Sequence, residues 1–147
     1  MVFILGSVNN FIMINASILE KITLNFSGDV LFDSLDPKER YIYSVMNNIE
    51  RILNTRRGSV KHIPDYGLPD LSIIYRHLPS SLSLLQKYIT FTLLKYEPRV
   101  QALQIQIVEN KSTDFIIAYE LLCKLKEVGY IRFSTTFDGD ESVRVFR

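Results

Sequence analysis

Four acidic residues are the side chains of this chain best suited to catalytic chemistry. They are Glu50, Asp65, Asp70 and Glu97. Hydrolysis of a glycosidic bond needs two carboxylates roughly 5 to 10 Å apart, and one of them must have a pKa raised by an apolar pocket. The chain contains no tryptophan, and no pattern around these residues indicates such a pocket. A peptidoglycan hydrolase therefore stays an alternative function, and we predict no catalytic residue.

The histidines and the cysteine do not form a recognisable site. His62 and His77 lie in an irregular central segment and lack the spacing of a zinc-binding helix motif. Cys123 is the only cysteine, so it forms no intramolecular disulfide, and its apolar surroundings favour a small buried hydrophobe. The sequence has no nucleophile elbow and no glycine-rich phosphate loop. We expect no metal and no cofactor.

The charge of the chain argues against a nucleic-acid partner. The formal net charge is +1 over 147 residues, whereas capture of phosphates needs clustered positive charge. The densest basic stretch is Arg56, Arg57 and Lys61, which is too little to form such a surface. With 47% hydrophobic and 22% charged residues, the composition is that of a globular protein.

Residues 1–15 form an apolar leader that we treat separately from the domain at 16–147. The leader has no positive amino-terminal region, and Asn9 and Asn10 interrupt it. It is shorter than the roughly 20 residues that cross a bilayer, so we expect no direct membrane insertion. Two interpretations stay open: the leader lies outside the fold, or translation starts at Met13.

Helical signals dominate the first two thirds of the domain. A capping box at Ser17–Glu20 predicts a short helix, and a polar joint at 25–34 follows. Asp36 as N-cap and Pro37 at the first helical position predict a long helix. Its apolar positions recur at helical spacing: Ile42, Val45, Met46, Ile49, Ile52 and Leu53.

A loop and a further helix follow the long helix. Proline and glycine at 58–79 predict an irregular segment. The next helix is expected to be capped by Ser80 or Ser81 and to end near Tyr96, because the residue before Pro98 is driven out of helical geometry.

The remainder of the chain changes to the two-residue period of strands. We predict strands at 103–107, 115–125, 131–137 and 143–146, with a hairpin turn at 138–140. Helices followed by an antiparallel β-meander of about four strands make a single α+β domain.

Three segments of the sequence together resemble a known family. They are Ile-Leu-Asn-Thr-Arg-Arg-Gly at 52–58, Asp-Tyr-Gly-Leu-Pro-Asp-Leu at 65–71 and Lys-Tyr-Glu-Pro-Arg at 95–99. Their order resembles the baseplate wedge family of contractile phage tails and type VI secretion systems, sometimes labelled lysozyme-like. The first two segments point to its secretion branch, the TssE proteins. The resemblance covers about residues 16–147.

The resemblance implies a non-enzymatic, structural role in a cytoplasmic baseplate docked at the inner-membrane complex. It implies contact with the baseplate proteins TssF, TssG and TssK and with the sheath proteins TssB and TssC, where the chain would help to nucleate the contractile sheath. The equivalent subunit of a phage tail is a further alternative.

Two groups of residues carry the expected site. Glu97, Pro98 and Arg99 flank a fixed bend, and the arginine fork suits carboxylates. The two charges either pair with partner subunits or pair with each other and fix helix to sheet. In the first case, Arg99→Ala should disrupt assembly and leave the melting temperature nearly unchanged.

The last strand is the second expected contact, as an edge with unpaired backbone groups that accepts or lends a strand. Its residues are Val143, Arg144, Val145 and Phe146. A structural motif is expected where the end of the long helix holds the central loop. Its residues are Asn54, Arg56, Arg57, Tyr66, Gly67, Leu68, Pro69 and Asp70.

Overall fold

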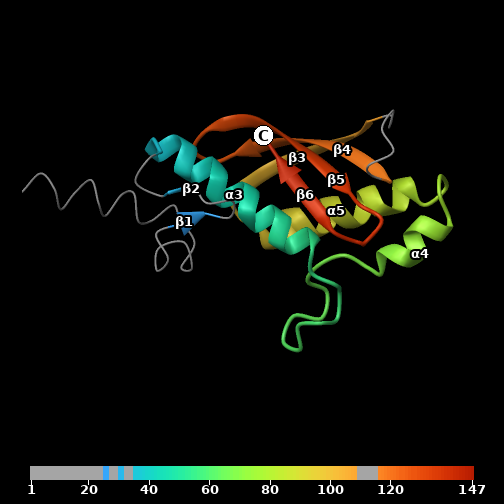
Figure 1. Ribbon diagram of the computed structural model, residues 1–147. Coiled ribbons are helices and arrows are strands. Elements are labelled where there is room, and N and C mark those ends of the chain that lie inside the picture. Colours follow the sequence, from blue (N-terminus) through green and yellow to red (C-terminus); the bar gives the residue numbers. More distant parts are fainter. Residues whose placement is uncertain (1–24, 27–29, 32–34, 109–115) are drawn as a thin grey trace, which may run out of the picture. The chain divides into compact units, whose positions relative to one another are not determined.

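The computed structural model describes residues 25–26, 30–31, 35–108 and 116–147 (Figure 1). The chain divides into two compact units, Met1–Asn47 and Asn48–Arg147, and the boundary lies inside one continuous helix. Helices followed by a four-stranded antiparallel sheet confirm the α+β class. The leader, its boundary at residue 15 and the short helix expected after Ser17 lie outside the described residues.

The first unit contains a strand pair and most of the long helix. Strands β1 (Asn25–Phe26) and β2 (Val30–Leu31) pair antiparallel, so the prediction of a polar joint at 25–34 is wrong for these four residues. Phenylalanine and valine favour extended backbone, a signal that the polar neighbours had masked. Helix α3 (Pro37–Leu53) begins as predicted, because the carboxylate of Asp36 accepts a hydrogen bond from the backbone N–H of Lys38 at 3.2 Å.

Two helices of the second unit follow the end of α3. Helix α4 (Leu71–Arg76) lies in the segment predicted as loop, and that prediction is wrong there. Asp70 starts this helix, since its carboxylate accepts from the N–H of Ser72 at 3.0 Å. The signal of this cap was present in the sequence, but the surrounding prolines outweighed it.

Helix α5 (Leu82–Tyr96) confirms the expected end at Tyr96 and the expected N-cap position at Ser81, but the Ser81 side chain makes no capping hydrogen bond. The hydroxyl of Ser81 donates to the carbonyl of Ile74, and that of Ser80 donates to the carbonyl of His77, both at 2.6 Å. Both hydroxyls are therefore oriented towards carbonyls at the end of α4, and the side chain of Ser81 makes no capping hydrogen bond to α5.

The sheet of the second unit is a meander in the order β3-β4-β5-β6, with every pair antiparallel. Its strands are β3 (Val100–Val108), β4 (Ile117–Leu125), β5 (Gly129–Phe137) and β6 (Val143–Phe146). Leu121 in the centre pairs with Ile105 on one side and Phe133 on the other. The alternation predicted all four strands, and β3 extends beyond the predicted 103–107 at both ends.

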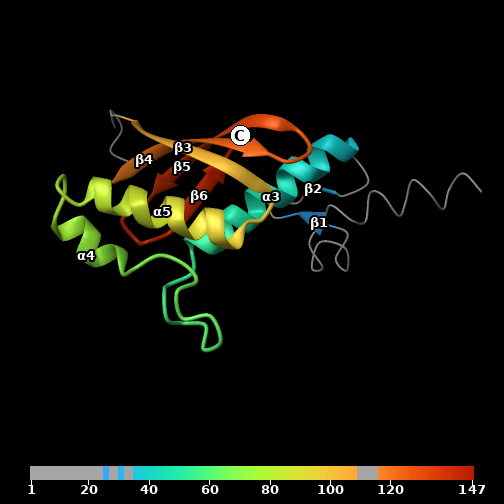
Figure 2. The ribbon, with the colours of Figure 1, turned by 180° about the vertical axis from the view of Figure 1, so that it is seen from behind.

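One face of the sheet is covered and the other is open. Tyr119, Leu121 and Phe133 on the covered face are fully buried. The hydroxyl of Tyr119 donates to the carbonyl of Leu82 at 3.0 Å, so α5 packs on this face. Figure 2 shows α5 running along the sheet beside β3. Lys124 and Arg132 lie on the open face and are exposed, which is the usual arrangement of a meander that is covered on one side.

Candidate partner-binding site

The Glu-Pro-Arg corner joins α5 to β3 through an ion pair between its own residues. The guanidinium of Arg99 donates to both carboxylate oxygens of Glu97, through Nε at 2.8 Å and Nη2 at 2.7 Å. The N–H of Arg99 donates to the same carboxylate at 3.1 Å, and the amide of Asn48 in α3 adds a bond at 2.7 Å. The carboxylate of Glu97 thus ties together α3, α5 and the start of β3.

The three corner residues differ in how far their side chains are exposed to solvent. Glu97 is 1% exposed, the side chain of Arg99 is 22% exposed and Pro98 is exposed. The structure therefore has the internal pairing, which was one of the two interpretations of this motif. Loss of Arg99 would leave the buried carboxylate of Glu97 with fewer partners. We therefore expect Arg99→Ala to lower the melting temperature, and this replaces the sequence-based expectation of a nearly unchanged value.

The end of α3 and the central loop interlock through their backbones. Arg56 and Leu68 form an isolated parallel bridge. The N–H of Arg57 donates to the carbonyl of Leu68 at 2.7 Å, and the N–H of Leu68 donates to the carbonyl of Thr55 at 2.9 Å. The two segments expected to form one structural motif lie together, held by backbone groups that sequence spacing alone does not pair.

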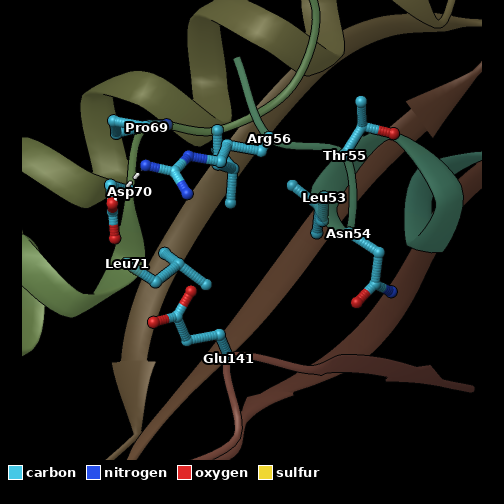
Figure 3. A pocket seen from close by; sticks show the side chains of 9 residues that line it. Leu53, Asn54, Thr55, Arg56, Pro69, Asp70, Leu71 and Glu141 are labelled. Atoms are coloured by element: carbon cyan, nitrogen blue, oxygen red, sulfur yellow. Dashed lines mark hydrogen bonds and ion pairs between the residues drawn. The ribbon is translucent and has the colours of Figure 1, made fainter. Parts of the chain in front are cut away.

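Side chains reinforce this interlock around a small cavity. The guanidinium of Arg56 contacts the carboxylate of Asp70 at 2.5 Å, as Figure 3 shows. Both residues line a cavity of about 50 Å³, together with Pro69 and, from the turn before β6, Glu141. Ligand sites usually measure several hundred Å³, so this space is too small for a sugar ring.

The loop is also fastened to the end of α5. The carboxylate of Asp65 accepts hydrogen bonds from the ammonium of Lys95 and the hydroxyl of Tyr96. These bonds, that of Lys95 first, lower the pKa of Asp65 from 3.8 to about 2. The rings of Tyr66 and Tyr96 meet edge to face, with their centres 5.0 Å apart.

The outer edge of β6 is occupied by two side chains from the carboxyl end of α3, Glu50 in its last turn and Asn54 directly after it. The amide of Asn54 accepts from the N–H of Val143 at 2.9 Å and donates to its carbonyl at 2.7 Å. The carboxylate of Glu50 accepts from the N–H of Val145 at 3.0 Å. The expectation of unpaired backbone groups at these positions is wrong, because an asparagine amide carries the same donor and acceptor as a peptide group.

The two remaining residues of β6 face the other way. Arg144 and Phe146 are exposed, whereas Val143 and Val145 are buried. Sequence reasoning missed Asn48 and Glu50 as parts of these contacts, and a polar residue in the second half of an amphipathic helix gives no signal for such a role.

The residues considered for catalysis are engaged in structural contacts. Glu97 is buried in its ion pair, Glu50 bonds to β6, and the pKa values of Asp65 and Asp70 are lowered, not raised. For Asp70 the largest cause is the hydrogen bond from Ser72. Burial raises the pKa of the Cys123 thiol to about 12, so it stays protonated and unreactive.

Among the described residues, no group of three or more His, Cys, Asp or Glu side chains is placed to hold a metal ion. Likewise, within residues 25–26, 30–31, 35–108 and 116–147, no helix has both the length and the apolar character needed to cross a bilayer.

Comparisons with known proteins give a family match and a structural match for this chain. The family model described as baseplate wedge protein gp25 matches residues 39–125. Among solved structures, a chain of the baseplate complex from the type VI secretion system is similar with a TM-score of 0.57 and 31% sequence identity. That match covers 75% of this chain and 97% of the other. A comparison with curated protein sequences found no match.

Proposed function

The chain belongs to the family of baseplate wedge protein gp25, as a TssE-like member, and on this premise we propose that it is a structural baseplate subunit of a type VI secretion system. The observation that carries the proposal is the 31% identity to a chain of the type VI baseplate complex, over 97% of that chain. The contacts of the candidate catalytic residues support a non-enzymatic role, because each of the four carboxylates is committed to a contact within the chain.

The finer proposal is that the subunit links the baseplate wedge to the contractile sheath and helps to nucleate sheath assembly. Its partners are then TssF, TssG and TssK in the wedge and TssB and TssC in the sheath. Its place is the cytoplasmic baseplate, docked at the inner-membrane complex. A nucleating subunit must hold its contact surfaces in fixed positions before the polymer forms. The hydrogen bonds and ion pairs between the helices, the central loop and the sheet meet that requirement.

At the Glu-Pro-Arg corner, Pro98 and Arg99 form the contact with a wedge partner. Pro98 is exposed, and the guanidinium of Arg99 is partly exposed at its side. Glu97 is a positioning residue, since its two bonds to Arg99 fix the plane of the guanidinium. A partner carboxylate would approach the same plane without displacing Glu97 from its buried place.

The last strand forms the contact with the sheath. Exposed Arg144 and Phe146 offer one cation and one aromatic ring, and buried Val143 and Val145 hold the strand in the sheet. Addition of a sheath strand at the β6 edge first requires release of the bonds from Asn54 and Glu50. Because breaking these hydrogen bonds costs free energy, the β6 edge of a free subunit is protected from pairing with strands of unrelated proteins.

The proposal is tested in cells that lack the chain. We expect these cells to assemble no sheath visible with a fluorescent sheath protein, and we expect the purified chain to associate with co-expressed wedge subunits. Normal sheath assembly without the chain would overturn the proposal. Association with phage tail proteins instead of secretion proteins would assign the chain to a phage baseplate.

A further inference from the structure

The side of α5 that faces away from the sheet carries apolar residues beyond those that the core uses. Leu84, Phe91 and Leu94 are 47%, 51% and 42% exposed, whereas Leu85 and Ile89 on the other side are fully buried. Together with the partly exposed Tyr88, the three exposed residues recur at helical spacing and form one stripe. A helix that is apolar on both sides is usually covered on both sides, so this stripe indicates a partner.

Positive charges border the stripe, and α5 itself contains no acidic residue. Lys87 lies one turn after Leu84, and the ammonium of Lys95 lies 5.5 Å from the centre of the Phe91 ring. Lys95 is already paired with Asp65. In the part of the chain that the structure describes, Lys87 has no carboxylate partner within 4 Å.

Arg57 extends the same pattern from outside the helix. Its guanidinium carbon lies 5.0 Å from the centre of the Tyr88 ring, a cation–π geometry. Its buried Nε has no hydrogen-bond partner, and no described carboxylate lies within ion-pair distance of it. Arginine and aromatic residues are enriched at interfaces, and here an arginine stacks on a partly exposed aromatic ring.

A hollow lies beside the stripe. It measures about 430 Å³, and its lining residues are Ser83, Gln86, Lys87, Thr90 and Phe91. Phe91 thus belongs both to the stripe and to the wall of the hollow. This shape offers a place for one large side chain of a partner next to the apolar contact.

We propose that this face binds an amphipathic helix of another baseplate subunit, with acidic residues flanking its apolar positions. We name it the α5 outer face and define it as Leu84, Lys87, Tyr88, Phe91 and Leu94, with Arg57. The stripe runs from Leu84 to Leu94, a rise of about 15 Å or nearly three turns, which matches helix-on-helix packing. The unpaired cations require complementary carboxylates on the partner. The proposal rests on the proposed function, because it names a baseplate subunit as the occupant.

Two other occupants fit the charges less well. Pairing of two copies of this chain through the α5 outer face would bring Lys87 of one copy and Arg57 of the other into a common cationic interface. Binding to an anionic membrane needs a polar face rich in lysine and arginine, and the lysines of α5 are only two, Lys87 and Lys95.

The test compares Phe91→Glu with Tyr130→Glu in the full chain. Tyr130 is a matched control, because it is an aromatic residue, 66% exposed, on the open face of the sheet. The probe is the set of co-expressed wedge subunits of the same secretion system, and the affinity is measured by titration with the purified chain. We expect Phe91→Glu to weaken binding at least about tenfold and Tyr130→Glu to change it less than about twofold. Circular dichroism checks that both variants melt like the wild type.

A second arm tests the charges. Lys87→Glu should weaken binding at low salt and much less at high salt, because the effect is electrostatic. If the wild type binds the wedge subunits and Phe91→Glu binds equally well, this inference is wrong and the proposed function stands. If the wild type does not bind them, both fail.

Two further measurements identify other occupants. A concentration-dependent dimer of the wild type that Phe91→Glu removes would replace the wedge helix with a second copy. Binding of the wild type, but not of Phe91→Glu, to vesicles with anionic lipid would replace it with a membrane. Either result would overturn the proposal.

Discussion

At position 67 the backbone has a φ of +93°, and the place where a side chain would begin is already occupied. A Cβ atom there would lie 2.0 Å from the carbonyl oxygen of Thr55. This close approach exists because the central loop pairs with the end of α3, where the N–H of Leu68 donates to that same carbonyl. Glycine at this position is a requirement of the interlock between loop and helix, not only of the turn.

Gly67→Ala is therefore expected to destabilise the fold by about 2–5 kcal/mol, the sum of two costs. The left-handed conformation costs an alanine about 1–2 kcal/mol, and displacement of the Thr55 backbone adds a cost of overpacking of about 1–3 kcal/mol. The measurement is urea unfolding. Gly58→Ala is the matched control, because Gly58 has a φ of +85° with nothing within 4 Å of the added atom. Equal effects of both substitutions would show that the close approach to Thr55 does not exist.

Asp65 gives the loop a pH-dependent contact. Its pKa is lowered from 3.8 to about 2, first by the bond from Lys95 and then by that from Tyr96. Its contribution to stability is therefore complete above about pH 4 and is lost as the pH falls towards 2. We expect Asp65→Asn to lower the unfolding free energy at pH 6 and to have a much smaller effect at pH 2, where about half of the folded molecules carry a protonated Asp65. Urea unfolding at both pH values measures this, and a difference that stays constant with pH would contradict it.

At the scale of elements, the carboxylate of Glu97 holds the joint between α5 and β3. Arg99→Ala removes two hydrogen bonds from a carboxylate that is 1% exposed, and we expect a loss of about 3 kcal/mol in unfolding free energy. Arg132→Ala is the control, because Arg132 and Glu120 are 3.8 Å apart on the open face and exposed pairs contribute less than about 1 kcal/mol.

In assembly experiments, the choice of substitution at Arg99 matters. Arg99→Ala mixes a loss of stability with a loss of partner contact, so it does not isolate the contact. Arg99→Lys retains the charge and loses the planar fork, which makes it the better probe of the corner. An Arg99→Ala variant as stable as the wild type would show that the internal ion pair does not form in solution.

The edge of β6 depends on Asn54, which directly follows α3, and on Glu50 in the last turn of that helix. Asn54→Ala leaves the N–H and the carbonyl of Val143 without their partner, and we expect a loss of about 2 kcal/mol. We also expect self-association, because an uncovered edge pairs with edges of other copies. Urea unfolding and sedimentation velocity measure the two effects. Glu50→Gln retains the acceptor for Val145 and should stay monomeric, whereas a fully monomeric Asn54→Ala would show that the edge needs no cover.

At the scale of the whole molecule, we expect the protein to lack hydrolytic activity on cell walls, because its four candidate catalytic carboxylates form contacts within the chain. The cavity lined by Arg56, Asp70 and Glu141 measures about 50 Å³, which is too small for a sugar ring. We expect the purified chain to leave the turbidity of a cell-wall suspension unchanged, with lysozyme as the positive control. Clearing of the suspension by the chain, and its loss in Glu97→Gln, would replace the structural role with hydrolysis.

The sequence by itself determined the elements that depend on local interactions. The period of apolar residues placed α3, α5 and the four strands of the meander, and Asp36 and Pro98 placed two helix ends, because caps and backbone angles act over a few residues. The failures were also local, at β1, β2 and α4, where short elements carry too few residues for a clear period.

Only the tertiary structure decided which polar groups meet. Asn54 and Val143 are 89 positions apart, Glu50 and Val145 are 95 apart, and Asn48 and Glu97 are 49 apart. The neighbouring residues in the sequence do not distinguish any of these side chains from an ordinary exposed polar residue. Its partner is selected by tertiary packing, which brings polar groups that are distant in the sequence within hydrogen-bonding reach.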